Sequence, residues 1–194
     1  NQISYDAAVY PYYLHGTFYV FRGKLINQQL VAMQNAGVED MQRLQTNTYN
    51  LRAQMARPLF RQYLDIMRLD DEARKYVDVV DEWNLQNDAN EIGATVFTLW
   101  MDSIMSAVYK DDFSRSALPM PWPDEVTLIE GMLKDSSYEF ADDINTPQKE
   151  TLTDQVTAAF IKIIPVCRQA QKEHRLAWGV YSDEIGRASC RERV

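Results

Sequence analysis

IGATVFTLWMDSIMSAV, residues 92–108, is the stretch that decides the fold. Its apolar side chains recur at the three- and four-residue spacing that marks one face of an α-helix. They also spread beyond a single face, because Leu99 and Trp100 are adjacent within the series from Ile92 to Val108. A helix that is apolar on several sides is one that other elements surround. The sequence therefore predicts a helix here, at the centre of the structure.

Both flanks of this stretch carry the same helical period. On the N-terminal side, the predicted helices run over 26–33 with Gly37 as a C-terminal stop, from Val38 through Leu44, over 51–67 with a bend near Pro58, and from Asp70 to Trp83. On the C-terminal side, they follow a rigid connector at Pro119, Pro121 and Pro123, and cover 126–133 and a last helix that starts at Asn145 or Thr146 and is kinked at Pro165. The predicted fold class is mainly α.

The N-terminal residues have a different character. The segment from Tyr5 to Phe21 is rich in Tyr and Phe, and Pro11 and Gly16 interrupt it. Aromatic residues combined with turn residues favour extended or loop structure, with one short strand at most. We therefore expect an extended lead-in ahead of the helices.

Composition limits the classes of function. At 194 residues, with 46% hydrophobic content, the chain is long enough to bury a core. The net charge is −8, with 20 Lys and Arg residues in total, whereas phosphate recognition requires a basic face. No apolar run approaches the roughly 20 residues that a membrane-spanning helix needs. We therefore expect no nucleic-acid partner and no membrane span.

The last residues, Ile185 to Val194, match nothing in the preceding pattern. They correspond, codon by codon, to a common short-read sequencing adapter translated in one frame, and the adapter's preceding bases also fit Glu184. The alternative is an ordinary basic tail. We expect residues 184–194 to be non-native and exclude them from the fold. Because the chain also opens on Asn1 rather than Met, we expect it to be an internal piece of a longer protein.

Local chemistry does not point to an active site. Three pairs of adjacent aspartates, 70–71, 111–112 and 142–143, lie at predicted helix ends or in loops, where carboxylates cap helices and face water. His15 and His174 have no acidic neighbour at the spacing of metal ligands. Outside the tail, Cys167 is the remaining cysteine, and its position on an apolar helix face predicts a small core residue.

A series of short elements, taken together, resembles the penicillin acylase (penicillin amidase) family over residues 1–183. The elements are, in order, Asn1-Gln2, Tyr10-Pro11-Tyr12-Tyr13, Phe21-Arg22-Gly23-Lys24-Leu25-Ile26-Asn27, Met41-Gln42-Arg43-Leu44-Gln45, Tyr49-Asn50-Leu51-Arg52-Ala53, Asp81-Glu82-Trp83-Asn84, Ala94-Thr95-Val96-Phe97 with Trp100, Phe140-Ala141-Asp142-Asp143 through Thr146 to Glu150-Thr151, and Trp178-Gly179. Each is weak alone, and their order and spacing carry the resemblance.

The resemblance implies a fold and a division of the chain. Family members are N-terminal-nucleophile hydrolases of αββα architecture, and this sequence resembles the helical region of their β-chain. Residues 1–25 would then join the catalytic sheet, residues 26–183 would form the helical region, and most of the sheet would be missing. Trp178-Gly179 resembles an element that precedes the returning strands.

The resemblance also implies a chemistry. In this family an autoprocessed N-terminal serine, whose own α-amino group is the base, cleaves an amide through an acyl-enzyme. That serine would lie upstream of this chain. The match places Asn1 at or beside the asparagine that donates to the oxyanion, with an ordinary polar loop residue as the alternative. The family's site-ordering arginine falls at Leu25 here, so Arg22 or Lys24 would replace it.

Metal, partners and location follow in the same way. Some members carry an aspartate calcium ligand shortly after the Tyr-Pro element, where this sequence has Leu14 and His15. No metal ligand or cofactor is therefore predicted for this chain, although calcium stays open for the complete parent. The implied partners are the α-chain, the rest of the β-chain and a small acylated amine as substrate. Members are commonly periplasmic or exported.

Two hypotheses for function remain. The first is the helical part of an amide-cleaving acylase, inactive by itself, whose parent acts on a β-lactam side-chain amide, an acyl-homoserine lactone or a similar compound. The second is a non-catalytic helical module that binds a protein partner. The aromatic lead-in favours the first, because it looks like a segment that needs a neighbouring sheet.

Overall fold

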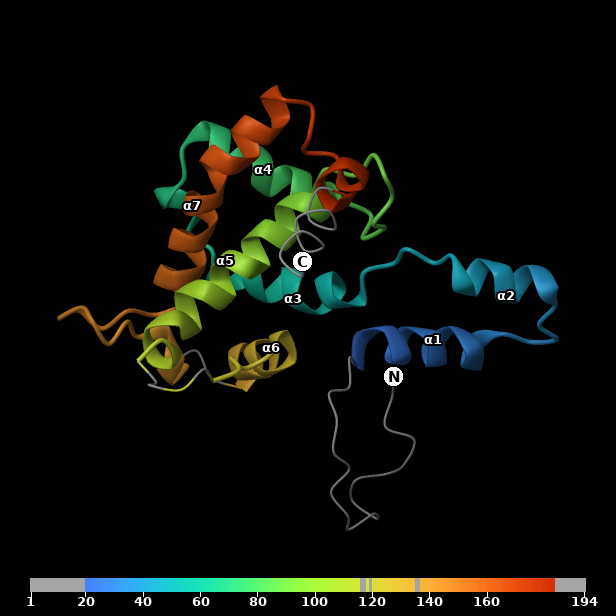
Figure 1. Ribbon diagram of the computed structural model, residues 1–194, viewed down its shortest axis with the longest axis horizontal. Coiled ribbons are helices and arrows are strands. Elements are labelled where there is room, and N and C mark those ends of the chain that lie inside the picture. Colours follow the sequence, from blue (N-terminus) through green and yellow to red (C-terminus); the bar gives the residue numbers. More distant parts are fainter. Residues whose placement is uncertain (1–19, 116–117, 119, 135–136, 184–194) are drawn as a thin grey trace, which may run out of the picture. The chain divides into compact units, whose positions relative to one another are not determined.

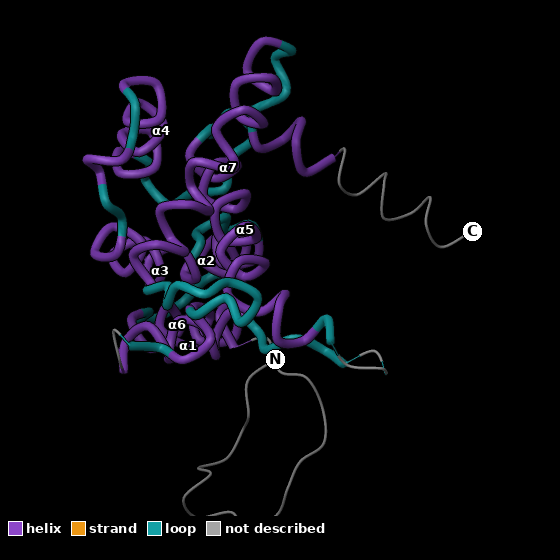
Figure 2. Tube along the Cα trace, turned by 90° about the vertical axis from the view of Figure 1, so that its left-hand side faces the viewer, coloured by secondary structure: helices purple, strands orange, loops and turns teal. Residues whose placement is uncertain are grey.

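The fold is seen in a computed structural model that describes residues 20–115, 118, 120–134 and 137–183. Its helices are α1 (Val20–Ala32), α2 (Val38–Gln45), α3 (Leu51–Tyr63), the 3-10 turn η1 (Ile66–Arg68), α4 (Asp71–Glu82), α5 (Gly93–Phe113), α6 (Glu125–Lys134), the 3-10 turn η2 (Glu139–Ala141) and α7 (Leu152–Lys172) (Figure 1). A short helical segment follows at 178–183. The described residues contain no β-strand (Figure 2). The mainly helical class predicted from the sequence is confirmed.

The chain divides into two compact units, residues 1–52 and 53–194. In the first unit, α1 begins at Val20, so residues 20–25 are helical rather than extended as expected. The aromatic lead-in ahead of Val20 lies outside the described residues. Gly37, expected to stop the first helix, instead caps the start of α2, where its N–H donates to Asp40 Oδ2 at 2.8 Å. The acidic start predicted for this second helix is confirmed, with Glu39 and Asp40 in its first turn.

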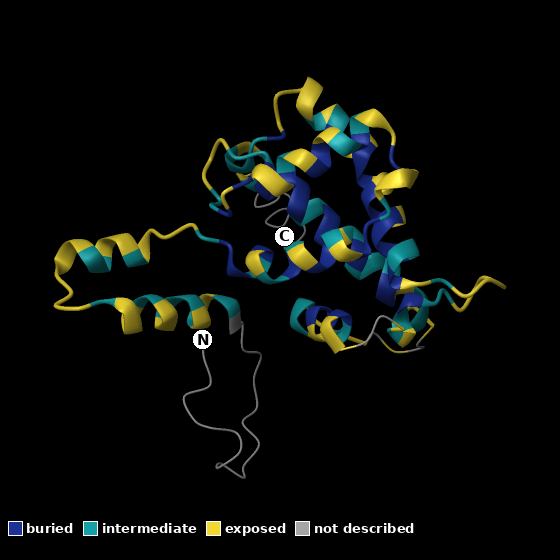
Figure 3. Ribbon diagram, turned by 180° about the vertical axis from the view of Figure 1, so that it is seen from behind, coloured by how far each residue is buried: buried dark blue, intermediate teal, exposed yellow. Residues whose placement is uncertain are grey.

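The second unit is built around α5, the helix that the opening stretch predicts. α5 packs against α7, α4 and η2. Its buried residues are Gly93, Ala94, Thr95, Val96, Phe97, Trp100, Met101, Ile104, Val108 and Tyr109. They occupy more than one side of the helix, and Figure 3 shows the buried colour running through this part of the body. The prediction of a central helix is confirmed.

Aromatic packing fixes the neighbours of α5. The ring of Trp100, which is fully buried, lies 4.5 Å from that of Phe160 on α7 and 5.0 Å from that of Phe60 on α3, measured between centroids. Trp100 Nε1 also donates to the carbonyl oxygen of Val156 at 3.1 Å. Burying a side chain of this size contributes about 3 kcal/mol, and the hydrogen bond removes the cost of a buried N–H.

The C-terminal end of α4 is capped by a side chain of α3. Arg57 Nη1 donates to three backbone carbonyl oxygens there, those of Val80 at 3.0 Å, Asp81 at 3.2 Å and Trp83 at 2.9 Å. These carbonyl groups lie at the last turn of α4, where backbone carbonyls have no hydrogen-bond partner within the helix itself. A cation also suits this end of a helix dipole. Arg57 therefore ties α3 to α4 and completes the end of α4.

The third predicted helix is too long. α3 ends at Tyr63, and the chain then forms η1, whose start is capped when the Asp65 carboxylate accepts from Met67 N at 3.0 Å. The Asp65 N–H donates to Thr157 Oγ1 on α7 at 2.9 Å. Ile66 and Met67 are consequently 40% and 80% exposed rather than part of an apolar face. A tertiary hydrogen bond, invisible to periodicity, ends the helix.

The last predicted helix starts too early. α7 begins at Leu152, after a capping box in which Thr151 Oγ1 accepts from Asp154 N at 3.3 Å and Asp154 Oδ2 accepts from Thr151 N at 3.0 Å. Asn145 and Thr146 lie in the preceding turn, where Thr146 Oγ1 donates to Glu150 Oε1 at 2.6 Å. Pro147 favours a helix that starts at Asn145 or Thr146, because proline suits the first helical position. The reciprocal cap at Thr151 satisfies two helix-end donors and therefore sets the actual start.

Asp70 provides a direct test of helix capping. It is the N-cap of α4, and its Oδ1 accepts from Ala73 N at 2.7 Å, whereas the side chain of the neighbouring Asp71 is 96% exposed. We expect Asp70→Ala to lower the free energy of unfolding by about 1 kcal/mol. Asp71→Ala, which removes the same charge, should change it by less than about 0.5 kcal/mol. Urea denaturation followed by circular dichroism measures both, and equal losses would contradict the capping role.

Candidate functional site

The two site residues expected from the sequence do not form a site within the described structure. Asn1 lies outside the described residues. Arg22 is exposed on α1 and takes part in no ion pair within the part of the chain that the structure describes. Their roles as oxyanion donor and site-ordering residue therefore stay predictions.

The Trp178-Gly179 element has a clear structural role. The backbone N–H groups of both residues donate to the loop between α4 and α5, Trp178 to Glu91 O at 2.9 Å and Gly179 to Ala89 O at 2.8 Å. A Cβ on Gly179 would meet Ala89 Cβ at 2.9 Å and Ala89 Cα at 3.1 Å. The glycine is needed because two backbones approach closely at this point. The element therefore holds the C-terminal segment 178–183 against the loop ahead of α5.

The receiving loop is itself held in place. Trp83 Nε1 donates to Gln86 O at 2.7 Å, and Gln86 N donates to Asn84 Oδ1 at 2.8 Å. The first residue of α5, Gly93, lies so close to Trp83 that an added Cβ would come within 2.4 Å of Trp83 Cβ. The loop between α4 and α5 is thus a fixed platform at the N-terminal end of α5.

A methyl group at position 179 should loosen this contact. We expect Gly179→Ala to lower the free energy of unfolding by about 1–3 kcal/mol, because the backbone of residue 89 must move to admit it. Adding Ala89→Gly should restore part of the loss, since it removes the nearest atom. Urea denaturation gives the stabilities, and hydrogen exchange at the 179 N–H reports the contact itself. Unchanged stability and exchange in Gly179→Ala would overturn this account.

Acidic side chains near the C-terminal end of α5 and in the loop after η2 accept hydrogen bonds from backbone N–H groups of that loop. Asp111 Oδ2 accepts from Ile144 N at 2.9 Å, Asp142 Oδ1 accepts from Glu150 N at 3.1 Å, and Glu150 Oε2 accepts from Asp143 N at 3.0 Å. Burial and the neighbouring charge of Asp111 raise the pKa of Asp112. Among the described residues, no group of His, Cys, Asp or Glu is arranged to hold a metal ion. These carboxylates therefore hold the loop at 142–150 in its conformation through hydrogen bonds to its backbone.

Cys167 is the remaining nucleophilic side chain of interest, and its surroundings make it inert. It is fully buried on α7, and burial raises the pKa of its thiol to about 12. A thiol with such a pKa is almost entirely protonated at neutral pH, and the thiolate is the reactive form. The sequence-based expectation of a small core residue agrees with this position.

The thiol's inertness can be measured. In a Cys190→Ser background, native Cys167 should react with an aromatic disulfide reagent at pH 8 on the order of a thousandfold more slowly than an ordinary thiol, since far less thiolate is present. Unfolding the same sample in urea should restore rapid labelling, which serves as the control. Rapid labelling of the folded protein would show that the thiolate is accessible.

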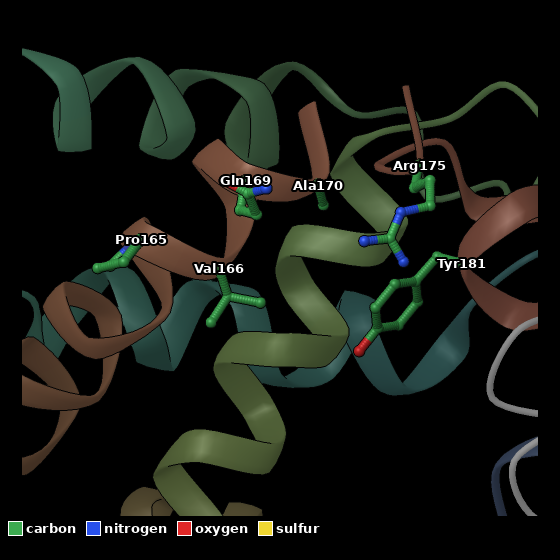
Figure 4. A pocket seen from close by; sticks show the side chains of 6 residues that line it. All are labelled: Pro165, Val166, Gln169, Ala170, Arg175 and Tyr181. Carbon is green, nitrogen blue, oxygen red and sulfur yellow. The ribbon is translucent and has the colours of Figure 1, made fainter. Parts of the chain in front are cut away.

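A pocket lies where the chain turns back after α7. Its volume is about 400 Å³, and it is lined by Pro165, Val166, Gln169, Ala170, Arg175 and Tyr181 (Figure 4). The chain reverses at His174, whose φ of 55° is the left-handed conformation that ends many helices. The pocket is therefore formed from α7 on one side and the returning segment on the other. We refer to it below as the α7 pocket.

The polar groups on the rim of the α7 pocket are engaged with one another. The Glu173 carboxylate accepts from the Gln169 side-chain amide and from the Arg175 guanidinium. Figure 4 shows that guanidinium beside the Tyr181 ring. Burial and the charge of Asp102 raise the pKa of Tyr181, so its hydroxyl is neutral. What remains facing the hollow is mainly apolar, from Pro165, Val166 and Ala170.

The α7 pocket was not predicted from the sequence. Its residues come from both sides of the turn at His174, and only the packed structure brings Val166 and Tyr181 together. His174 adopts a positive φ although it is not glycine, so the residue types near the turn do not predict it. His174 itself is not among the residues that line the pocket.

Within the described residues, no helix is both long and apolar enough to cross a lipid bilayer. The comparison with protein families gives a match to the family described as Penicillin amidase, over residues 1–185. No curated protein matches the chain. No solved structure matches it either.

Proposed function

Because the chain belongs to the penicillin amidase family, we propose that it is the helical region of the β-chain of an enzyme that hydrolyses an acyl amide bond. The observation that carries this proposal is the family match, which extends over residues 1–185 and therefore through both compact units. The fold is consistent with it, because the described residues are mainly helical. The proposed nucleophile is an N-terminal serine outside this chain.

The helical region would support the site rather than perform the chemistry. Asn1 is proposed to donate its side-chain amide to the oxyanion of the tetrahedral intermediate, and Arg22 to order the site. The proposed substrate is a small acylated amine, such as a β-lactam with an acyl side chain or an acyl-homoserine lactone. The proposed partners are the α-chain and the rest of the β-chain, and the proposed location is the periplasm or outside the cell. The chain expressed alone is expected to be inactive.

The proposal is tested by recovering the complete reading frame around this sequence and assaying it on a chromogenic acyl amide. We expect hydrolysis that depends on a serine exposed by self-cleavage, with an acyl-enzyme that mass spectrometry detects. Residues 1–194 by themselves should give no turnover above background. A complete reading frame without such a serine, or without amide hydrolysis on a panel of acyl amides, would refute the function.

Asn1 has a specific expected effect within that complete enzyme. Removing one oxyanion donor should lower kcat by about 10²–10³-fold while changing KM little, because the donor acts mainly in the transition state. Asn1→Ala tests this, and Asn90→Ala is the matched control, since Asn90 is exposed in the loop between α4 and α5. A normal kcat in Asn1→Ala would assign that residue to an ordinary loop role.

A further inference from the structure

We propose that the α7 pocket binds a small uncharged molecule that has a flat apolar body and one N–H group, as indole does. The pocket belongs to the second compact unit alone, and the structure describes all the residues that line it. Its size, the rigidity of its walls and the chemistry of its polar groups point to this class of ligand. The proposal does not rest on the hydrolase function.

The hollow has the size and the surface of a small-molecule site. Its volume of about 400 Å³ lies within the range of ligand pockets in proteins, roughly 300–1,000 Å³. Pro165, Val166 and Ala170 supply aliphatic surface. Figure 4 shows the Tyr181 ring across the hollow from Val166. A flat ring can therefore lie between an aromatic wall and an aliphatic wall, and an apolar cavity of only about 150 Å³ is enough to bind benzene.

Both walls of the pocket are held in place by the protein itself. Arg175 N donates to Ala170 O at 2.8 Å, across the turn that separates the two walls. Leu176 is buried and anchors the returning segment in the core. The N–H groups of Trp178 and Gly179 tie that segment to the loop ahead of α5. A site that is already formed loses little conformational entropy when a ligand enters it.

The charged groups around the pocket disfavour an ionic ligand of either sign. Glu173 and Arg175 form an ion pair with each other. Asp102 adds a second carboxylate close to Tyr181, so an anion would meet two negative charges. A cation would have to lie beside the Arg175 guanidinium, which Figure 4 shows next to the Tyr181 ring. The hollow therefore suits a molecule without net charge.

Gln169 gives the pocket a hydrogen-bond acceptor. Its Nε2 donates to the Glu173 carboxylate, which identifies the donor end of the amide. The other end is the carbonyl oxygen Oε1, which can accept from an N–H group. Indole combines that group with a flat apolar body of two fused rings, and it carries no charge. It is therefore the probe that matches the pocket.

A titration of the full chain with indole, followed by ¹H–¹⁵N NMR, tests the site. We expect saturable shifts at the amides of 166–170 and 175–181, with a Kd of about 0.1–5 mM. 1-Methylindole, which lacks the N–H group, should bind about three- to tenfold more weakly. Shifts that never saturate, shifts spread over the whole chain, or tighter binding of tryptamine or indole-3-acetate would overturn the proposal.

Variants show whether the lining residues carry the binding. Val166→Asp places a charge in the apolar wall and should weaken indole binding about tenfold or more. Val31→Asp makes the same change on α1, at a residue that is 88% exposed and outside the pocket, and should leave the affinity unchanged.

The acceptor role of Gln169 has its own readout. Gln169→Leu removes the amide at an exposed position, so indole and 1-methylindole should then bind equally well. Circular dichroism verifies that each variant is folded. Unchanged indole affinity in Val166→Asp, an equal loss in Val31→Asp, or a preference for indole that survives Gln169→Leu would each contradict the proposed site.

Discussion

The contact between Trp100 and the carbonyl oxygen of Val156 is the constraint on which the second unit depends. An indole N–H that is fully buried must find a partner, and here it finds a backbone oxygen on α7 at 3.1 Å. That bond sets where α7 lies along α5, and the ring of Phe160, one turn further along, completes the contact at 4.5 Å. Phe60 closes the other side at 5.0 Å. Three helices thus meet at one side chain.

The two ends of α5 are held by different kinds of contact. At the N-terminal end, backbones approach each other so closely that glycine is required at 93 and 179. At the C-terminal end, Tyr109 is buried among aromatic rings, and its hydroxyl is 2.8 Å from that of Tyr138. Adding side-chain atoms at the N-terminal end of α5 would therefore destabilise the packing. At the C-terminal end, removing large side chains would destabilise it.

How much of the fold could be predicted from the sequence depends on whether the residues that determine each feature lie close together in the chain. The burial of α5 could be predicted because apolar residues on several sides of one helix leave no alternative to a central position. The Asp70 cap could be predicted because the carboxylate and the Ala73 N–H that donates to it lie within one turn of the chain. The end of α3 could not, since it depends on Thr157, which is 92 residues from Asp65 in sequence. The start of α7 was predicted too early, at Asn145 or Thr146, although the Thr151–Asp154 capping box that sets the actual start is also local in the sequence.

The candidate site divides in the same way. The element Trp178-Gly179 could be identified from the sequence. Its hydrogen-bond partners in the loop at 89–91 could be identified only from the folded structure. The α7 pocket gives no local signal, because His174 adopts its positive φ without glycine. Asn1 and Arg22 are predicted from resemblance alone, and their roles stay predictions, because the proposed function assigns the nucleophile to a serine outside this chain.

A helical region can serve a hydrolase without contributing a nucleophile, provided that it is rigid where it meets the rest of the enzyme. Catalytic geometry tolerates displacements of only about 0.5 Å, so supporting elements must be locked by packing. In the second unit, Arg57 completes the end of α4, the glycine contact at 179 fixes the returning segment, and Trp100 holds α3 and α7. Each of these contacts joins segments that are distant in sequence. Under the proposed function, the second unit would hold the parts of the enzyme that contact it in a fixed position.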